Sequence, residues 1–353
     1  MLKKIPCRVW ILLGLLVGIT VTQQIPGWGD KYTQHVYPII AHSLGRISQH
    51  IPFAMGDLFI ALAIGWLVAC PFYMKLRKRR SWKGILLYET EFLLWIYAWF
   101  YLAWGLNYAQ SDFYGRTGIA RAGYSEERFK AFAYRYVNEM NAAYTDTTST
   151  LPDKVAAKVA QSYRLPQRLP GIHPLFLKLP KAKTMLFTPL ASMVGVTGSM
   201  GPFFCEFTLN GDVLPPYYPA TFTHELAHFQ GIARESEANL YSFLACTRSN
   251  APSIRLSGYL SILPHVLSNA SRLMEKEEYA TLYKQIRPEV ITLAQHNQQY
   301  WAEKYSPLIG RIQGILYDLY LKGNKISSGR KNYSEVIGLL ISYQEWEKQK
   351  PTS

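Results

Sequence analysis

Residues 222–239 read FTHELAHFQGIARESEAN, and the spacing of their polar residues sets the fold around them. His224 and His228 lie four positions apart, so on a helix both imidazoles face the same way and can reach one metal ion. Phe222 and Leu226 are interleaved with them and predict that this helix is buried. Because a buried helix rarely holds polar side chains without partners, the pattern favours a metal site.

A catalytic zinc site takes three protein ligands, so the two histidines need a third. In the longer pattern H-E-x-x-H-x-x-G-x-x-H the third histidine would stand at Arg234, which does not ligate. Glu235 and Glu237 are the remaining candidates. On one straight helix, however, Glu235 would lie about 10 Å along the axis from His228. The helix must therefore turn, and Gly231 is placed to allow it.

After the turn, Glu235 and Asn239 are four positions apart and share a helix face. Together they can supply a carboxylate ligand and an amide that orients a ligand histidine. Glu237 points elsewhere on the same helix, so we expect Glu235 as the third ligand and keep Glu237 as the alternative. Glu225, next to the first histidine, is placed to deprotonate a water held by the metal and is the predicted catalytic residue.

Composition limits the class of protein. The 353 residues are 49% hydrophobic, 14% aromatic and only 18% charged, which excludes a disordered chain. Four cysteines are too few for a disulfide scaffold. The net charge of +14 would suit a nucleic-acid partner, but six of the bases lie within residues 75–83, beside a hydrophobic run. Such a cluster is typical of the cytoplasmic flank of a membrane span, so we expect no nucleic-acid partner.

Three hydrophobic runs precede the metal motif, over residues 9–22, 53–74 and 84–106. A spanning helix needs about 20 residues, so residues 1–106 are expected to anchor the chain in a lipid bilayer. The first run also fits a signal-peptide core, an alternative that the sequence leaves open. Bases cluster at the N-terminus and at 75–83, which predicts that both lie in the cytoplasm and that residues 107–353 form a domain outside it.

The motif resembles known families. Glu-Ser-Glu-Ala-Asn at 235–239, after H-E-x-x-H, is similar to the motif of gluzincin-type zinc peptidases, in which the first glutamate binds zinc. More specifically, residues 224–246 resemble an uncharacterised bacterial membrane family catalogued as domain of unknown function 3810. The resemblance extends to the N-terminal spans and to residues 201–204, 320–324 and 332–334. It implies a membrane-anchored zinc metallopeptidase, without an established substrate, in the bacterial inner (plasma) membrane.

Zinc peptidases of this kind often bind the substrate along an edge strand above the metal. Residues 202–209, PFFCEFTL, are the expected strand, since an extended peptide can pair with its edge. The expected substrate residues are Phe203, Phe204, Cys205 and Glu206. Glu206 is predicted to face solvent, with a contact to the substrate amine or to a ligand histidine as the alternative. The candidate donors to an oxyanion are Tyr217, Tyr218, Tyr241 and Arg234.

The sequence therefore predicts a mainly α-helical fold, with transmembrane helices followed by a helical, zincin-like extracytoplasmic domain that carries a small β-sheet. The expected cofactor is Zn²⁺, and the expected partners are a peptide or protein substrate and the lipid bilayer. The expected function is hydrolysis of peptide bonds. Two alternatives remain: a non-catalytic, zinc-stabilised scaffold or binding protein of the envelope, and a zinc hydrolase of a non-peptide envelope amide. Cys205 and Cys246 are expected to be thiols, with a disulfide as the alternative.

Overall fold

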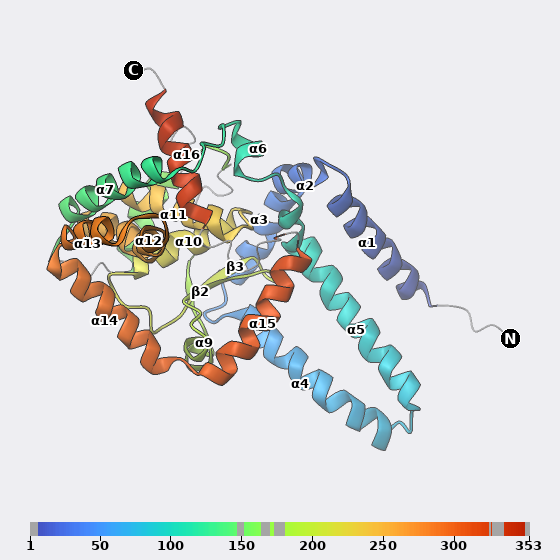
Figure 1. Ribbon diagram of the computed structural model, residues 1–353. Coiled ribbons are helices and arrows are strands. Elements are labelled where there is room, and N and C mark those ends of the chain that lie inside the picture. The colour runs from blue at the N-terminus through green and yellow to red at the C-terminus, as the bar shows by residue number, and fades with distance from the viewer. Residues whose placement is uncertain are drawn as a thin grey trace.

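The computed structural model describes residues 6–146, 152–163, 170–172, 181–324, 326 and 335–349. Within these ranges the chain is mainly helical, and its strands form one small sheet. The first helices project from a helical body that contains the sheet (Figure 1). The expected mainly α-helical class with a small sheet is thus confirmed. Residues 332–334, part of the family resemblance, lie outside the described ranges.

Three apolar helices form the projecting part: α1 (Cys7–Gln24), α4 (Met55–Leu76) and α5 (Trp82–Ala103). Each is long and apolar enough to cross a membrane, and little of each is buried inside the protein. A helix that is apolar all round is stable only in a protein core or in lipid. The three helices therefore associate the chain with a membrane, over nearly the segments that hydropathy predicts.

The far ends of the spans lie together. The start of α1 and the turn between α4 and α5 are at the same end of the molecule (Figure 1). Arg8, at the start of α1, forms an ion pair with Glu91 of α5, with Nε and Oε1 2.7 Å apart. Arg8 and the basic loop at 75–83 therefore lie at the same end of the spans, which agrees with the distribution of charge along the sequence.

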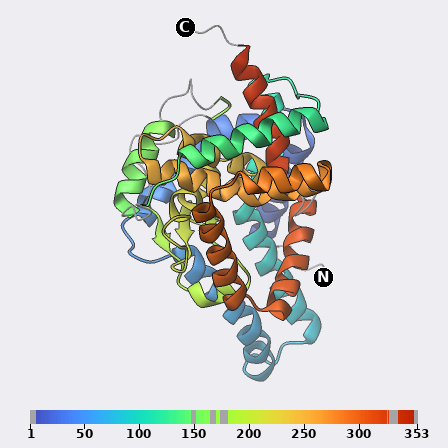
Figure 2. The ribbon, with the colours of Figure 1, turned by 60° about the vertical axis from the view of Figure 1, so that its left-hand side comes forward.

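The body is built around three helices that pack on one another: α10 (Tyr218–Phe229), α11 (Glu235–Thr247) and α12 (Pro252–Leu273). Further helices cover them: α7 (Glu126–Ala142), α8 (Pro152–Tyr163), α13 (Lys276–Lys284) and α16 (Val336–Lys348). In Figure 2 the green α7 lies against the orange helices α12 and α13. Helix α7 buries Phe129, Phe132 and Tyr136, whose spacing places them on one face.

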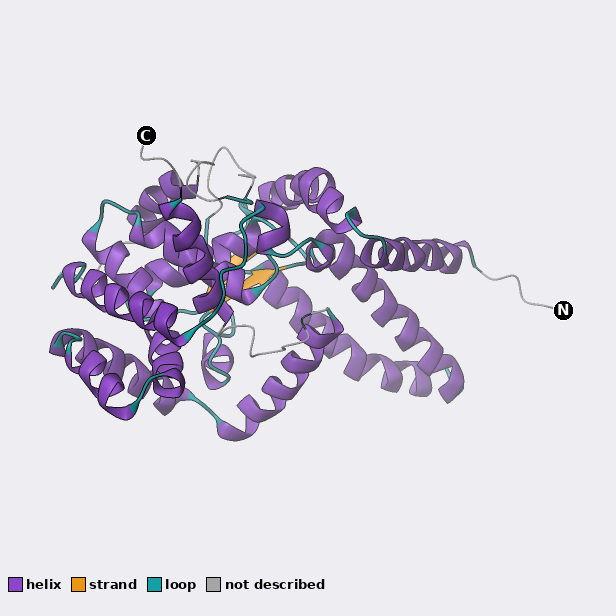
Figure 3. Cartoon of the chain, turned by 45° about the horizontal axis from the view of Figure 1, so that its top comes forward, coloured by secondary structure: helices purple, strands orange, loops and turns teal. Residues whose placement is uncertain are grey.

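The sheet has the order β1-β3-β2, with β1 (Lys183–Thr184), β2 (Gly198–Gly201) and β3 (Glu206–Leu209). It is the small orange feature enclosed by helices in Figure 3. The expected strand at 202–209 is therefore wrong in its first half, because residues 202–205 form the turn from β2 to β3 and Cys205 has a φ of +46°. Since β3 pairs on both sides, it has no free edge, whereas among the described residues β2 pairs with β3 alone.

The other described helices are α2 (Trp28–Lys31), the π-helix η1 (Tyr32–Val36), α3 (Tyr37–Ser48), the 3-10 helix η2 (Gly105–Ala109), α6 (Phe113–Thr117), α9 (Thr188–Met193), α14 (Pro288–Lys304) and α15 (Pro307–Gly323). Several of them join the spans to the body. The hydroxyl of Tyr37 in α3 donates to the carbonyl oxygen of Phe229 at 2.6 Å. The indole Nε1 of Trp104, just after α5, donates to the carbonyl oxygen of His228 at 3.0 Å.

All four cysteines are free. The sulfur of Cys205 lies 3.7 Å from the carbonyl oxygen of Ala103, and that of Cys246 lies 3.2 Å from Thr223 Oγ1. Burial raises the pKa of each of these thiols to about 12. The expected pair of thiols is thus confirmed, and the alternative disulfide is wrong.

Candidate metal centre

The reversal at Gly231 brings the start of one buried helix back to the middle of another. Helix α10 ends at Phe229 and α11 begins at Glu235, so the expected turn is present. Gly231 has a φ of +88°, which residues with a side chain rarely adopt. A Cβ there would lie 3.1 Å from both Asn107 Oδ1 and Thr33 Cγ2. The backbone conformation therefore favours glycine strongly, and the tight space around it adds to that preference.

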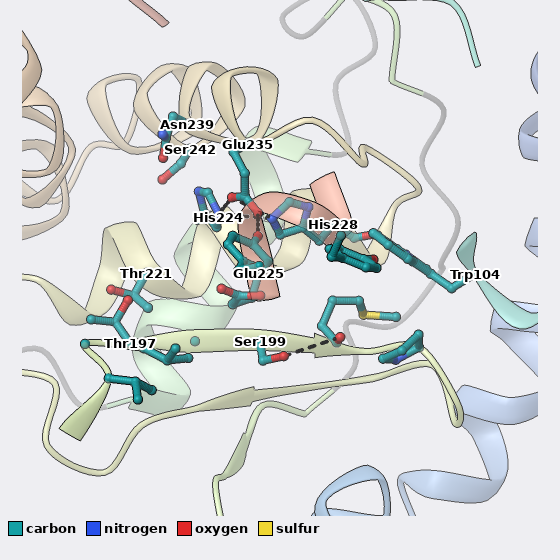
Figure 4. A pocket seen from close by; sticks show the side chains of 18 of the residues that line it. Trp104, Thr197, Ser199, Thr221, His224, Glu225, His228, Glu235, Asn239 and Ser242 are labelled. Atoms are coloured by element: carbon teal, nitrogen blue, oxygen red, sulfur yellow. Dashed lines mark hydrogen bonds and ion pairs between the residues drawn. The ribbon is translucent and has the colours of Figure 1, made fainter. Parts of the chain in front are cut away.

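The turn gathers His224, His228 and Glu235 into one cluster (Figure 4). The Nε2 atoms of the two histidines are 3.0 Å apart. Oε2 of Glu235 lies 3.1 Å from His224 Nε2 and 3.3 Å from His228 Nε2. Ligand atoms about 2.0–2.2 Å from zinc in a tetrahedral site are themselves about 3.3 Å apart. The three atoms are therefore spaced so that one ion can lie at bonding distance from all of them.

A hydrogen bond on the far side of His228 fixes its neutral tautomer. Nδ1 of His228 lies 2.6 Å from the carbonyl oxygen of Ile232, which only accepts, so Nδ1 donates. In the neutral ring Nε2 then carries a lone pair directed at the carboxylate of Glu235. An imidazole lone pair and a carboxylate oxygen at this distance repel each other unless a cation lies between them. Either a proton or a metal ion satisfies this requirement.

The charges in the cluster favour a cation strongly. Burial lowers the pKa of His228, but the charge of Glu235 and its hydrogen bond outweigh burial and raise that pKa to about 9. Burial also opposes ionisation of Glu235, but the charge of His228 and hydrogen bonds from both histidines hold its pKa well below the usual range. A metal ion would take the place of the proton that the cluster otherwise retains. The donor set therefore fits a divalent metal.

Glu225 is a buried carboxylate beside this cluster. It is 4% exposed, and within the described part of the chain its Oε2 has no hydrogen-bond partner. Burial raises the pKa of this carboxyl, and the charges of His224 and His228 offset part of the rise. A Cβ at Gly198 would lie 2.5 Å from Glu225 Oε1, so β2 passes directly against the carboxylate. A carboxylate with an uncommitted acceptor in this position is suited to take a proton from water.

Glu237 lies on another side of α11 and has different partners. Its Oε2 accepts from Arg116 Nη2 at 2.6 Å, and its Oε1 accepts from the backbone N–H of Phe113 at 2.9 Å. The side chains of Arg116 and Glu237 are 9% and 2% exposed. Glu237 therefore belongs to a buried ion pair and lies apart from the cluster, which contains Glu235 instead.

Tyr317 is a residue of the site that the sequence reasoning missed. Its hydroxyl donates to Glu235 Oε1 at 2.6 Å, which leaves Oε2 directed at the histidines. Tyr317 lies on α15, 82 residues after Glu235. No spacing rule connects two residues so far apart, so the only available signal was the family resemblance at residues 320–324, at the end of the same helix. This hydrogen bond holds the carboxylate of Glu235 in one orientation.

A cavity of about 820 Å³ adjoins the cluster and Glu225. Its other walls are β2 with the residues just before it, Ile60 of α4, Phe100 of α5 and one face of α15. Asn239 also lines this cavity and lies on the His224 side of the cluster in Figure 4. None of the four candidate oxyanion donors lines it: Tyr217, Tyr218, Tyr241 and Arg234. Tyr241, for example, donates its hydroxyl to the carbonyl oxygen of Pro170 instead.

The comparison with protein families agrees with the resemblance. The family described as Protein of unknown function (DUF3810) matches residues 32–341. The chain belongs to this family. The match includes α4, α5, the candidate metal cluster and α15, whereas α1 lies before its first residue, so the family covers two of the three apolar helices together with the site. No curated protein and no solved structure matches the chain.

In this DUF3810 chain one of the four expected substrate residues, Phe203, lines the cavity beside the cluster, whereas Phe204, Cys205 and Glu206 are not among its lining residues. Glu206 is buried, forms an ion pair with Lys183 and accepts from the backbone N–H of Gly56 at 2.6 Å. It therefore neither faces solvent nor contacts the cluster. Phe203 and Phe204 pack against Phe59 of α4, with ring centroids 4.7 and 5.9 Å away. The strand beside Glu225 is β2, whose sequence Gly-Ser-Met-Gly carries little strand propensity and so gave no signal.

Proposed function

We propose that this chain is a membrane-anchored, zinc-dependent metallopeptidase of the gluzincin type. The observation that supports this best is the convergence of three ligand atoms, from His224, His228 and Glu235, beside the uncommitted carboxylate of Glu225. Within the described chain the group has three members, and it borders a cavity. Structural zinc sites usually close all four positions with protein, whereas catalytic sites keep one open. This favours a catalytic site over a scaffold.

Each residue then has a defined part in hydrolysis. An ion bound to the cluster would supply Lewis acidity and lower the pKa of water. Glu225 accepts the proton of the attacking water and passes it to the leaving amine. Tyr317 keeps Glu235 oriented through its hydrogen bond. The unpaired edge of β2 is the place where a peptide backbone would add as a further strand, in place of the segment expected from the sequence.

The compartment is part of the same proposal. Arg8 and the basic loop at 75–83 lie at one end of the spans, and helices α10 and α11, which carry the cluster, lie beyond the other end. Basic flanks mark the cytoplasmic side of a membrane. The cluster would therefore work outside the cytoplasm, at the bacterial inner membrane, on a peptide or protein substrate.

The test is hydrolysis of a broad peptide library by the purified, Zn²⁺-loaded full chain and by its Glu225→Gln variant. Glutamine keeps the shape but does not accept the proton, so we expect unchanged metal content and a loss of rate of about 10²–10⁴-fold. Glu277→Gln, an exposed position on α13, is the matched control and should retain full activity.

Metal-loaded wild-type protein that cleaves no peptide would rule out the peptidase. Cleavage of a non-peptide amide that depends on Glu225 would instead favour the envelope hydrolase. A metal held by four protein ligands, with no solvent position, would favour the scaffold.

A further inference from the structure

The outer face of α15 is apolar. Leu308, Ile312, Ile315, Leu316 and Leu319 are all exposed, with Leu308 at 72% and Leu319 at 63%. Side chains three or four residues apart lie on one helix face, so these five form a continuous row, which we name the α15 stripe. Soluble proteins seldom leave such a row open to water, and one that is exposed marks a contact with a partner or a membrane.

The opposite face of α15 points into the body and is more polar. Tyr317 donates to Glu235 from this face, and Gln313 lines the cavity. The buried residues of α15 are Gly310, Gly314 and Leu321, so this face carries one large aliphatic side chain, against the five of the stripe. A surface helix of a soluble protein has the reverse arrangement, with its apolar face on the core. The pattern of α15 therefore suits a helix whose outer side is in contact with lipid.

Helix α15 lies where the spans leave the body. The ring of Tyr320 packs on Phe100 of α5 with centroids 5.9 Å apart, and the hydroxyl of Tyr101 donates to Asn324 Oδ1 at 2.8 Å. In Figures 1 and 3, α15 runs across the direction of α4 and α5 rather than along it. An amphipathic helix in this orientation lies in the plane of a bilayer surface when neighbouring helices span that bilayer.

A second apolar segment connects α15 to the start of α4. The backbone N–H of Ser306, just before α15, donates to the carbonyl oxygen of Met193 at the end of α9 at 2.9 Å. The backbone N–H of Leu186, just before α9, donates to Asp57 Oδ2 in the first turn of α4 at 2.8 Å. The exposed apolar side chains of this segment are Leu186, Phe187 and Leu190. Exposed apolar side chains thus follow the chain of contacts from α4 through α9 to the α15 stripe.

We propose that the α15 stripe lies in the surface layer of the same bilayer that α4 and α5 span, so that α15 is an in-plane membrane helix. The stripe is joined to the spans through α9 and α5. We therefore infer that the bilayer, rather than a second copy of the chain, covers the stripe. Arg311 and Lys322 are exposed on the same helix, Lys322 in an ion pair with Asp318 at 2.6 Å, and bases beside an apolar face suit anionic headgroups. This placement does not depend on the metal chemistry and goes beyond the peptidase proposal.

The placement has a consequence for the metal cavity. The cavity is walled by Ile60 and Phe100 of the spans on one side and by α15 on another. With the α15 stripe in lipid, this cavity lies at the bilayer surface. A substrate that enters it would then be a molecule held at that surface. Tyr317 lies on the same helix, and its hydroxyl donates to Glu235. The position of α15 in the bilayer therefore also sets the position of this hydroxyl.

The test places a fluorophore on α15 in the full chain, reconstituted in phosphatidylcholine–phosphatidylglycerol nanodiscs. Cys7 and Cys70 are replaced by Ser, and bimane is attached to Ile312→Cys or to Leu316→Cys. Leu62→Cys on α4 reports lipid, and Lys276→Cys on α13 reports water. Two quenchers are compared: lipids with brominated acyl chains, and iodide in the water.

We expect bimane at 312 and 316 to be quenched several-fold by brominated lipid, as at 62, and weakly by iodide, whereas position 276 shows the reverse. Quenching at 312 and 316 by iodide alone would overturn the proposal, because α15 would then be in water. Protection from both quenchers would overturn it as well, because protein, such as a second copy of the chain, would then cover the stripe. Two neighbouring positions guard against a local effect of one substitution.

Discussion

At the scale of single residues, two glutamates on the same turn of α11 have opposite surroundings. Glu235 faces two histidines with no positive side chain nearer, whereas Glu237 is neutralised by Arg116 at 2.6 Å. The two glutamates are two positions apart on α11, and side chains two positions apart on a helix point to different faces. Their surroundings differ for this reason. Identical side chains therefore stand in the candidate metal site and in a structural ion pair.

Substitution of these two glutamates separates metal binding from stability. We expect Glu235→Gln to lose bound zinc, because the carboxylate ligand is gone. Glu237→Gln should retain zinc but lower the free energy of unfolding by about 3–5 kcal/mol, because the buried Arg116 charge is left without its partner. Metal content by mass spectrometry and thermal unfolding in detergent measure the two effects. Loss of zinc in Glu237→Gln with unchanged stability would contradict the assignment.

The hydroxyl of Tyr317 offers a second prediction at this scale. In Tyr317→Phe the ring and its packing remain, but Glu235 Oε1 loses a hydrogen bond of 2.6 Å. Removal of a residue that orients a ligand typically weakens metal affinity by about 10–100-fold. Competition with a zinc chelator measures the change, and Tyr305→Phe, next to the start of α15, is the control. Equal zinc affinities in the two variants would show that Tyr317 does not orient the ligand.

At the scale of elements, local patterns and distant contacts differ in how far the sequence reveals them. The pair of helices and the turn at Gly231 could be predicted, because a helical repeat and a glycine are local signals. The sheet could be placed only in part: β3 lies within the expected strand at 202–209, but β2 gave no signal, since strands of two to four residues carry no usable period. Tyr317 joins the site through contacts between helices far apart in the chain. The outward apolar face of α15 was missed for another reason: periodicity shows that a helix is amphipathic but not what its apolar face contacts.

The turn between α10 and α11 can be tested as an element. Gly231→Ala places a side chain at a φ of +88° and against Asn107, so we expect a loss of stability of at least about 1–2 kcal/mol and weaker zinc binding. The matched control is Gly338→Ala inside α16, where a Cβ meets nothing within 4 Å. There alanine should stabilise the helix by up to about 1 kcal/mol. Thermal unfolding with and without zinc distinguishes the two. Equal effects of both substitutions would show that the turn does not depend on its left-handed residue.

At the scale of the whole molecule, the anchor completes the helix that carries the histidines. The last carbonyl groups of a helix have no partners within it. In α10 and the turn after it, these oxygens accept hydrogen bonds from the anchor side of the chain: Trp104 to His228, Tyr37 to Phe229, and Gln110 to Gly231. The contacts are buried, so the spans and the metal cluster share one core. The anchor is therefore part of the support of the site.

This shared core predicts that residues 107–353 alone do not form the metal centre. Without residues 1–106 the fragment loses Trp104 and Tyr37, and the carbonyl oxygens at the end of α10 lose two buried donors. We expect the isolated fragment to unfold without a cooperative transition and to bind zinc well below one ion per chain, whereas the full chain in detergent binds one. Near-ultraviolet circular dichroism and metal analysis of both proteins, with the same purification tag, measure this. A fragment that binds zinc as tightly as the full chain would show that the anchor only tethers a self-sufficient domain.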